Sequence, residues 1–207
     1  INAIYYGLVS GQNQPLTNGT ISPLRSDINN YNFPLTVTGQ PGQDYYLAAT
    51  IIDQAGNQSD CLYYGPIRFD LTPPQVNLDL TGLVNYGSGT YLNGIDNLNV
   101  TVDSSDSESG IRETQLAILD VGGNPVSGWG DWNMVKTALL IPGTQYQIVA
   151  KASNYAGLTT QRTSVRFIYD NTSPQITGIE GPAGTVSAGE PVSIAISAEE
   201  PESAVKQ

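Results

Sequence analysis

The sequence predicts an all-β protein built from tandem antiparallel β-sandwiches, and two observations support this fold class. The apolar stretches are short and rich in Val, Ile, Thr and Tyr, which favour strands, and Gly, Pro and Asn separate them. A long segment also recurs along the chain, as expected of a repeated structural unit. We therefore expect the 207 residues to hold one complete repeat and parts of two others.

The recurring segment begins at a Pro-Gly pair. Residues 41–57 read PGQDYYLAATIIDQAGN, and residues 142–158 read PGTQYQIVAKASNYAGL. After Tyr45 and after Tyr146, apolar residues alternate with others, as on a strand with one face toward a core. The position of each tyrosine is typical of the tyrosine corner, in which a hydroxyl group holds a crossing loop of a β-sandwich. The Ala-Gly pair that follows suits a tight turn, because glycine accepts positive φ.

Each copy then continues into a strand and a proline-rich segment. Residues 67–76 read IRFDLTPPQV, and residues 167–176 read FIYDNTSPQI. Proline ends the strand because it has no N–H group to donate to a neighbouring strand. We expect Asp70 and Asp170 to hold their turns by hydrogen bonds, the alternative being that each helps to bind a cation that stiffens the chain.

These motifs give the chain a family resemblance. Asp53-Gln-Ala-Gly-Asn57 followed by Asp70-Leu-Thr-Pro-Pro74 resembles the pattern of bacterial and archaeal Ig-like and fibronectin-III-like surface repeats. The second copy departs from it, with Asn154 for Asp, Leu158 for Asn and Ser173 for Pro. The resemblance implies tandem Ig-like or fibronectin-III-like sandwiches outside the cell. Such repeats occur in adhesins, S-layer proteins, sheath or filament proteins, and spacers of secreted enzymes.

The repeat sets the domain boundaries that we predict. Residues 1–74 form an Ig-like repeat without its first two strands, residues 75–173 a complete one, and residues 174–207 the first two strands of a further one. This shifted frame has two explanations. Either the chain is part of a longer array, or the tail of one copy completes the sandwich of the next by strand addition. Both imply a linear, head-to-tail array.

The strands that we predict follow these boundaries. In the complete repeat they lie at residues 75–82, 97–103, 112–120, 126–133, 136–141, 145–153 and 161–170. In the first repeat they lie at residues 5–9, 33–38, 45–52 and 62–69.

Composition excludes several classes of function. The net charge is −11, so the Lys and Arg clusters that hold nucleic acids or anionic membranes are absent. The chain has no histidine, which removes the usual general base and most zinc sites. It also has no apolar run of the roughly 20 residues that a membrane span needs. Its single cysteine, Cys61, is expected to be a buried, inert thiol.

An acidic loop is the candidate metal site. Asp103, Asp106 and Glu108 alternate with serines, as oxygen ligands do in calcium loops, although the full EF-hand spacing is absent. A solvated polar loop is the alternative interpretation. Residues 199–202 keep the acidity at the matching place in the next repeat. Calcium is the one cofactor that the sequence suggests.

Two further features concern glycans. N-x-Ser/Thr sequons occur at Asn18, Asn57, Asn99 and Asn171, and we expect Asn18 and Asn57 to be the better glycosylation acceptors. Trp129 and Trp132 could form a sugar-stacking platform. On a regular strand, however, residues three apart face opposite sides, so we expect one in the core and one at a loop edge.

The sequence therefore predicts a structural protein and no enzyme. We expect a repeat of an extracellular surface protein, in an S-layer, sheath or filament, that acts as a rigid spacer and assembly module. Its partners would be neighbouring copies, joined head-to-tail or laterally. The alternative is an adhesin stalk or a carbohydrate-binding or spacer module of a secreted enzyme.

Overall fold

The computed structural model describes residues 1–11, 19–21 and 34–203. Strands make up 49% of the described residues and helices 4%, which confirms an all-β fold. Contacts divide the chain into two compact units. Unit 1 holds residues 1–74, 106–111 and 154–158, and unit 2 holds residues 75–105, 112–153 and 159–207.

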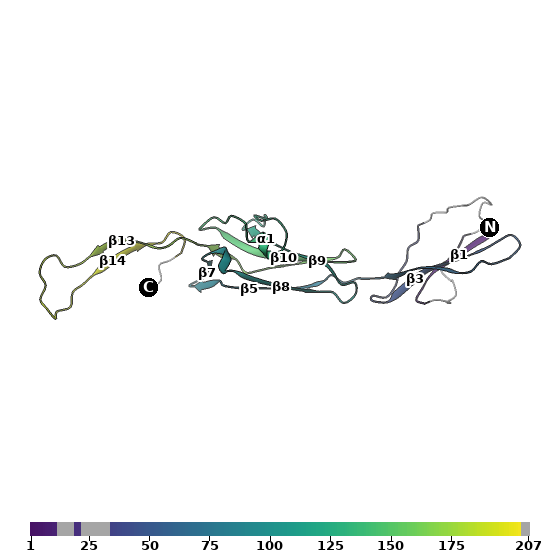
Figure 1. The fold of residues 1–207 in the computed structure, drawn as a ribbon, viewed down its shortest axis with the longest axis horizontal. Coiled ribbons are helices and arrows are strands. Elements are labelled where there is room, and N and C mark those ends of the chain that lie inside the picture. Colours follow the sequence, from purple (N-terminus) through teal and green to yellow (C-terminus); the bar gives the residue numbers. More distant parts are fainter. Residues whose placement is uncertain (12–18, 22–33, 204–207) are drawn as a thin grey trace. The chain divides into compact units, whose positions relative to one another are not determined.

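Unit 1 is built on a four-stranded antiparallel sheet with strand order β2-β1-β3-β4 (Figure 1). The long strand β1 pairs along its whole length with β3, from Ala3 opposite Ile52 to Val9 opposite Tyr46. Strands predicted at residues 5–9, 45–52 and 62–69 are confirmed. The strand bounds are β1 (Ala3–Val9), β2 (Gly19–Ile21), β3 (Asp44–Ile52) and β4 (Leu62–Arg68).

Unit 2 contains a six-stranded sheet with the order β11-β10-β12-β7-β6, in which β9 also pairs with β10. Two antiparallel pairs, β5–β8 and β13–β14, form separate sheets. The bounds are β5 (Gln75–Thr81), β6 (Val84–Tyr86), β7 (Gly89–Leu92), β8 (Asn99–Ser105), β9 (Ile111–Asp120), β10 (Gln145–Asn154), β11 (Thr159–Thr163), β12 (Phe167–Tyr169), β13 (Gln175–Glu180) and β14 (Ala195–Glu199).

The core of unit 2 lies between the β5–β8 pair and the layer that contains β9 and β10 (Figure 1). On β10, Tyr146, Ile148 and Ala150 are at most 3% exposed, as their alternation predicts. Val76 on β5 and Leu98, which directly precedes β8, are buried to a similar degree. Burial of aliphatic side chains from both layers supplies the main driving force for this unit.

A tyrosine corner is present in both copies of the repeat. The Tyr45 hydroxyl oxygen accepts a hydrogen bond from the backbone N–H of Gln40, with an N···O distance of 2.8 Å. The Tyr146 hydroxyl oxygen accepts one from Ile141 N–H at 3.0 Å. Each bond joins residues five apart, so the same side chain holds the same loop in units 1 and 2.

Two predicted strands, at residues 126–133 and 136–141, were wrong. Isolated bridges and a single helical turn, α1 (Trp132–Val135), occupy this segment. The carboxylate of Asp131 accepts a hydrogen bond from Met134 N–H at 3.0 Å, which is an N-cap. This N-cap favours a helical turn at residues where the sequence pattern only weakly favours a strand.

Other strand predictions need smaller corrections. The strand predicted at residues 161–170 is divided into β11 and β12, and between them the Ser164 hydroxyl accepts a hydrogen bond from Ile148 N–H. Residues 34–38 form no strand, and residue 33 lies outside the described part of the chain. Strands β6 and β7 were not predicted, because each is too short to show an alternation. Among the described residues, no helix is long and apolar enough to span a membrane.

Candidate functional sites: two carboxylate clusters

The two Asp-x-Thr turns, at residues 70–72 and 170–172, have the same geometry. Oδ1 of Asp70 accepts a hydrogen bond from Thr72 N–H at 3.1 Å, and Oδ1 of Asp170 accepts one from Thr172 N–H at 3.2 Å. Each aspartate thus closes a turn directly after a strand-like segment. The turn hydrogen bonds predicted for these two residues are confirmed.

The first carboxylate cluster lies in unit 1 and contains Asp70, Asp106 and Glu108. The buried amide of Asn154 donates from Nδ2 to Asp70 Oδ2 at 2.7 Å and to Asp106 Oδ2 at 3.2 Å. The Ser109 hydroxyl also bonds the Asp70 carboxylate. Glu108 Oε2 accepts from Leu71 N–H at 2.9 Å. The carboxylate oxygens of this cluster therefore accept hydrogen bonds from uncharged groups, namely an amide, a hydroxyl and a backbone N–H.

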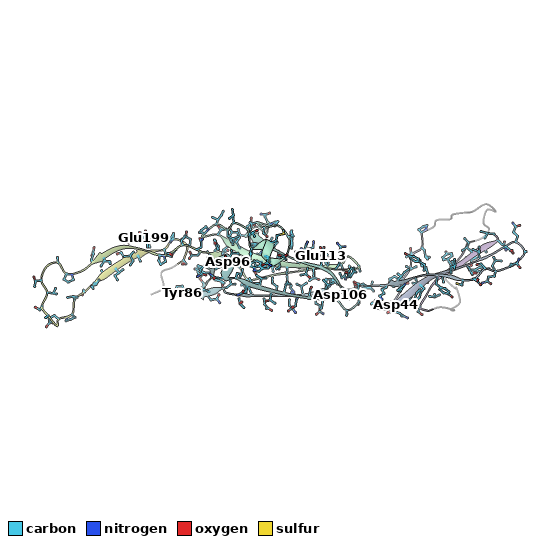
Figure 2. The ribbon with its side chains drawn as sticks, in the orientation of Figure 1. Asp44, Tyr86, Asp96, Asp106, Glu113 and Glu199 are labelled. Atoms are coloured by element: carbon cyan, nitrogen blue, oxygen red, sulfur yellow. The ribbon has the colours of Figure 1, made fainter. Side chains whose placement is uncertain are left out.

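Asp106, labelled in Figure 2, organises the acidic loop itself. Its Oδ1 accepts hydrogen bonds from the backbone N–H groups of Glu108, Ser109 and Gly110, at 3.1, 2.8 and 3.1 Å. Burial alone raises the pKa of the Asp106 carboxyl. The hydrogen bonds from these N–H groups and from Asn154 outweigh burial, so the pKa is lowered.

Asp103 has a different setting from the other two predicted calcium ligands. It lies on β8 in unit 2 with an exposed side chain. Together with Asp79 and Arg162 it lines a shallow polar hollow of about 330 Å³. The structure thus brings Asp106 and Glu108 together with Asp70, and places Asp103 in another group of residues.

The second carboxylate cluster, in unit 2, consists of Asp170, Glu200 and Glu202. One oxygen of each lies within 4.8 Å of the others. The Thr172 hydroxyl oxygen lies 3.1 Å from Asp170 Oδ1, 3.2 Å from Glu200 Oε1 and 2.6 Å from Glu202 Oε2. A hydroxyl group donates one hydrogen at a time, so Thr172 cannot satisfy three carboxylates together. Backbone N–H groups add one donor each to two of them, from Thr172 to Asp170 Oδ1 at 3.2 Å and from Glu202 to Glu200 Oε1 at 3.4 Å.

The two clusters occupy matching places in the repeat. Asp70 corresponds to Asp170, and Glu108 corresponds to Glu202. The sequence showed each acidic segment separately but did not show that they meet. The signal that could have found the meeting was the repeat itself, because the two acidic segments recur in the same order: Glu108 follows Asp70 by 38 residues, and Glu202 follows Asp170 by 32.

Three turns elsewhere use the same side-chain chemistry. Asp53 Oδ1 accepts from Ala55 and Asn57 N–H, Asp120 Oδ1 accepts from Gly122 and Asn124 N–H, and Asn154 Oδ1 accepts from Leu158 N–H. Hydrogen bonds from Asn57 lower the pKa of Asp53, and those from Asn124 lower the pKa of Asp120. The side chains of these three residues therefore stabilise the backbone of their own turns.

The predicted glycosylation sites fall differently. Asn57 is exposed, but its Nδ2 donates to Asp53 Oδ2 at 2.8 Å, so a glycan there would alter this bond. Asn18 lies outside the described residues.

The tryptophans and the cysteine can also be placed. Trp132 packs against the core of unit 2, and Lys151 Nζ lies 5.9 Å from the centroid of the half-buried Trp129 ring. The two rings thus have different surroundings, but both are half-buried, so the expected fully buried core tryptophan is not found. The prediction of a buried Cys61 was wrong, because this residue is half-exposed at the entry to β4.

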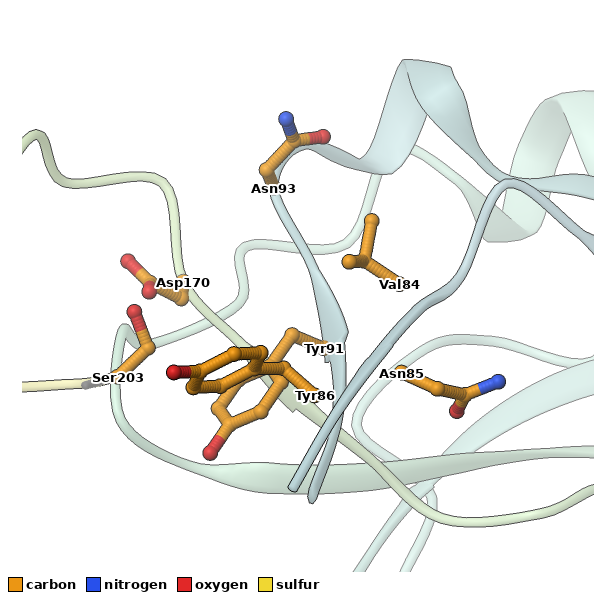
Figure 3. Close-up of a pocket in the computed structure, with 7 residues that line it drawn as sticks. All are labelled: Val84, Asn85, Tyr86, Tyr91, Asn93, Asp170 and Ser203. Carbon is orange, nitrogen blue, oxygen red and sulfur yellow. The ribbon is translucent and has the colours of Figure 1, made fainter. Parts of the chain in front are cut away.

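An apolar pocket of about 250 Å³ lies beside the second cluster (Figure 3). The rings of Tyr86 and Tyr91 line it, and Asp170 and Ser203 lie at one edge. Asn85, Asn93 and Val84 complete the lining. Aromatic rings with polar groups around them offer both stacking and hydrogen bonds to a small polar ligand.

Comparisons of the chain with models of protein families, with curated proteins and with solved structures find no match.

Proposed function

We propose that this chain is a structural repeat segment of an extracellular surface protein, in an S-layer, sheath or filament, and that it serves as a spacer and assembly module. The supporting observation is that both copies of the repeat use the same polar side chains for the same backbone contacts. Tyr45 and Tyr146 hold matching loops, and Asp70 and Asp170 close matching turns.

The use of these polar groups favours a scaffold over a catalyst. Asp53, Asp106 and Asp120 each accept several backbone hydrogen bonds, so their oxygens are committed to turns. A general acid or base must instead be directed toward a substrate. In this proposal each complete repeat is an Ig-like β-sandwich, and sandwiches in series give length and stiffness.

Small-angle X-ray scattering of the purified chain tests this proposal. A linear series of sandwiches gives an elongated particle. A single globule of this length would have a radius of gyration of about 17 Å. A measured value near that figure, with a compact pair-distance distribution, would contradict the spacer function.

The tyrosine pocket favours one second candidate, a carbohydrate-binding module. Sugar rings stack on aromatic faces while their hydroxyl groups bond to amides and carboxylates, and Tyr86, Tyr91 and Asn93 provide such groups. Affinity electrophoresis in gels containing polysaccharides would detect binding. This candidate would be favoured if the polysaccharide slowed the wild-type chain and the Tyr155→Ala variant, which is changed at an exposed position, but did not slow the Tyr86→Ala variant.

A further inference from the structure

One face of the unit 1 sheet carries apolar side chains that remain exposed. Strand register places Leu47 opposite Tyr64 and Ala49 opposite Leu62, so these four residues share a face. Leu62 is 77% exposed and Tyr64 is 75% exposed. The same residues line a groove of about 500 Å³. We call the surface formed by Leu47, Ala49, Ile51, Leu62 and Tyr64 the open face.

Unit 2 shows what covers the corresponding face in the complete repeat. Ile148, Ala150 and Ala152 on β10 match Leu47, Ala49 and Ile51 on β3, and all three are 0% exposed. By contrast, Ile51 is 39% exposed.

The cover in unit 2 is the β5–β8 pair. Val76 of β5 and Leu98, the residue directly before β8, join the buried residues of β10 in one core cluster. Arg162, which pairs with Ala150 as Leu62 pairs with Ala49, donates a hydrogen bond from Nε to Val76 O at 3.3 Å. The position equivalent to Leu62 therefore touches the covering pair.

The chain carries a second element of this kind, the β13–β14 pair. It occupies the place after Pro174 that β5–β8 occupies after Pro74. Its large apolar side chains are exposed. Ile176 is 66% exposed, whereas its counterpart Val76 is 3% exposed. Register places Ile176, Ile179 and Ile196 on one face. Ile194 directly precedes β14, and we infer that it continues the same face because it lies two residues before Ile196.

We propose that the β13–β14 pair of one copy covers the open face of unit 1 in a second copy, in the manner in which β5–β8 covers β10. This inference rests on the proposed assembly function and adds the contact that joins the copies. Both surfaces are apolar and exposed, and the β13–β14 pair has the same place in the repeat as the β5–β8 pair that covers β10.

The contact joins two different surfaces, so its symmetry is heterologous. Each copy presents one β13–β14 pair, which we call the donor pair, and one open face. Copies can therefore add head-to-tail into an open chain, or into a closed ring if the rotation between neighbours allows it. A two-stranded pair buries less surface than a standard protein interface. We therefore expect affinity on the order of micromolar or weaker.

Sedimentation velocity over a wide concentration range, using the whole chain, tests the proposal. The wild-type chain is expected to form a concentration-dependent series of oligomers. Leu62→Asp places a charge on the open face, and Ile194→Asp places one on the donor pair. Because burial of an unpaired charge is unfavourable, each variant alone should lose at least about tenfold in association constant.

A mixture of the two variants makes the test specific. Leu62→Asp retains an intact donor pair, and Ile194→Asp retains an intact open face. Their mixture should form a one-to-one dimer and no larger species. Ser197→Asp, on the opposite face of β14 from Ile194 and Ile196, is the matched control and should assemble as the wild type does.

Several outcomes would overturn the proposal. These are a chain that stays monomeric at every concentration, variants that assemble normally, or a mixture that forms no dimer. Self-association of Ile194→Asp alone would show that open faces meet each other instead. A monomeric chain whose open face is covered by another segment of a longer protein would also overturn it. Scattering from the monomer still tests the spacer function, so failure of the two ideas can be told apart.

Discussion

Single hydroxyl groups hold the crossing loops of both units. Tyr146 is 3% exposed, and its ring lies near Phe167 with centroids 6.4 Å apart, so its hydroxyl group is carried to Ile141 by a fixed aromatic ring. The ring supplies apolar burial, and the hydroxyl oxygen satisfies a backbone N–H. The residue thus links the core to the loop that precedes β10.

We predict that Tyr146→Phe lowers the free energy of unfolding by about 1 kcal/mol, because it deletes one hydrogen bond and leaves the ring in place. Urea denaturation followed by fluorescence measures the change. Tyr155→Phe is the control, because Tyr155 is 70% exposed and its substitution should have little effect. Equal stability of the two variants would contradict the role assigned to Tyr146.

The acidic loop predicts a pH dependence of stability. The pKa of Asp106 is lowered in the folded chain from the ordinary value of 3.8, because hydrogen bonds outweigh burial. A lowered pKa contributes stability above the ordinary pKa, and that stability is lost as the pH falls through the folded value. Asp53 and Asp120 add to the same trend, since their pKa values are also lowered.

We therefore expect the wild-type midpoint of urea unfolding to fall as the pH drops below about 4, and Asp106→Asn to weaken this dependence. Asp60→Asn, at an exposed position, serves as the control. A steeper dependence in Asp106→Asn than in the wild type would contradict the assignment.

At the scale of elements, the two strand pairs of the same repeat position differ in what surrounds them. Leu98, directly before β8, is 2% exposed within the core, whereas Ile179 in β13–β14 is 68% exposed. Leu98→Ala removes buried methyl groups and should cost about 2–5 kcal/mol. Ile179→Ala should change the stability of the isolated chain by less than about 0.5 kcal/mol.

Chemical denaturation of the two variants in dilute solution checks this contrast. A large loss of stability in Ile179→Ala, in a sample shown to be monomeric, would mean that the β13–β14 pair is covered within its own chain.

The sequence predicted the long strands and the recurring turns well, because both depend on local patterns. Period-two alternation marked β3 and β10, and the Asp-x-Thr spacing marked the turns at Asp70 and Asp170. The helical turn α1 was missed because its Asp131 cap is a single residue inside an apolar stretch. The carboxylate clusters depend on contacts between distant segments, and alternation carries no information on these.

At the scale of the whole molecule, the recurrence of acidic clusters bears on calcium, which stays a prediction. Calcium prefers several carboxylate oxygens, and the second cluster offers three carboxylates around one hydroxyl donor. If the ion binds the folded chain alone, added calcium should raise the melting midpoint and a chelator should reverse the rise.

Variants make this prediction specific to residues. Glu202→Gln should reduce the calcium-dependent rise, and Asp103→Asn should leave it unchanged, because Asp103 stands on β8 outside both clusters. Differential scanning calorimetry with and without chelator measures the midpoints. An unchanged midpoint would remove calcium from the description of this protein.

The parallel pairing of β7 with β12 affects when unit 2 can fold during synthesis. Ile168 lies beside Tyr91 and Tyr169 beside Leu92, so the middle of the six-stranded sheet joins segments from opposite ends of the repeat. A ribosome releases Tyr91 long before Tyr169, and contacts between distant segments form slowly. During synthesis, the apolar side chains of Leu92 and Ile148 therefore remain unburied until Phe167 has been added and can pack against them. A chaperone that shields apolar surface would be most useful during this interval.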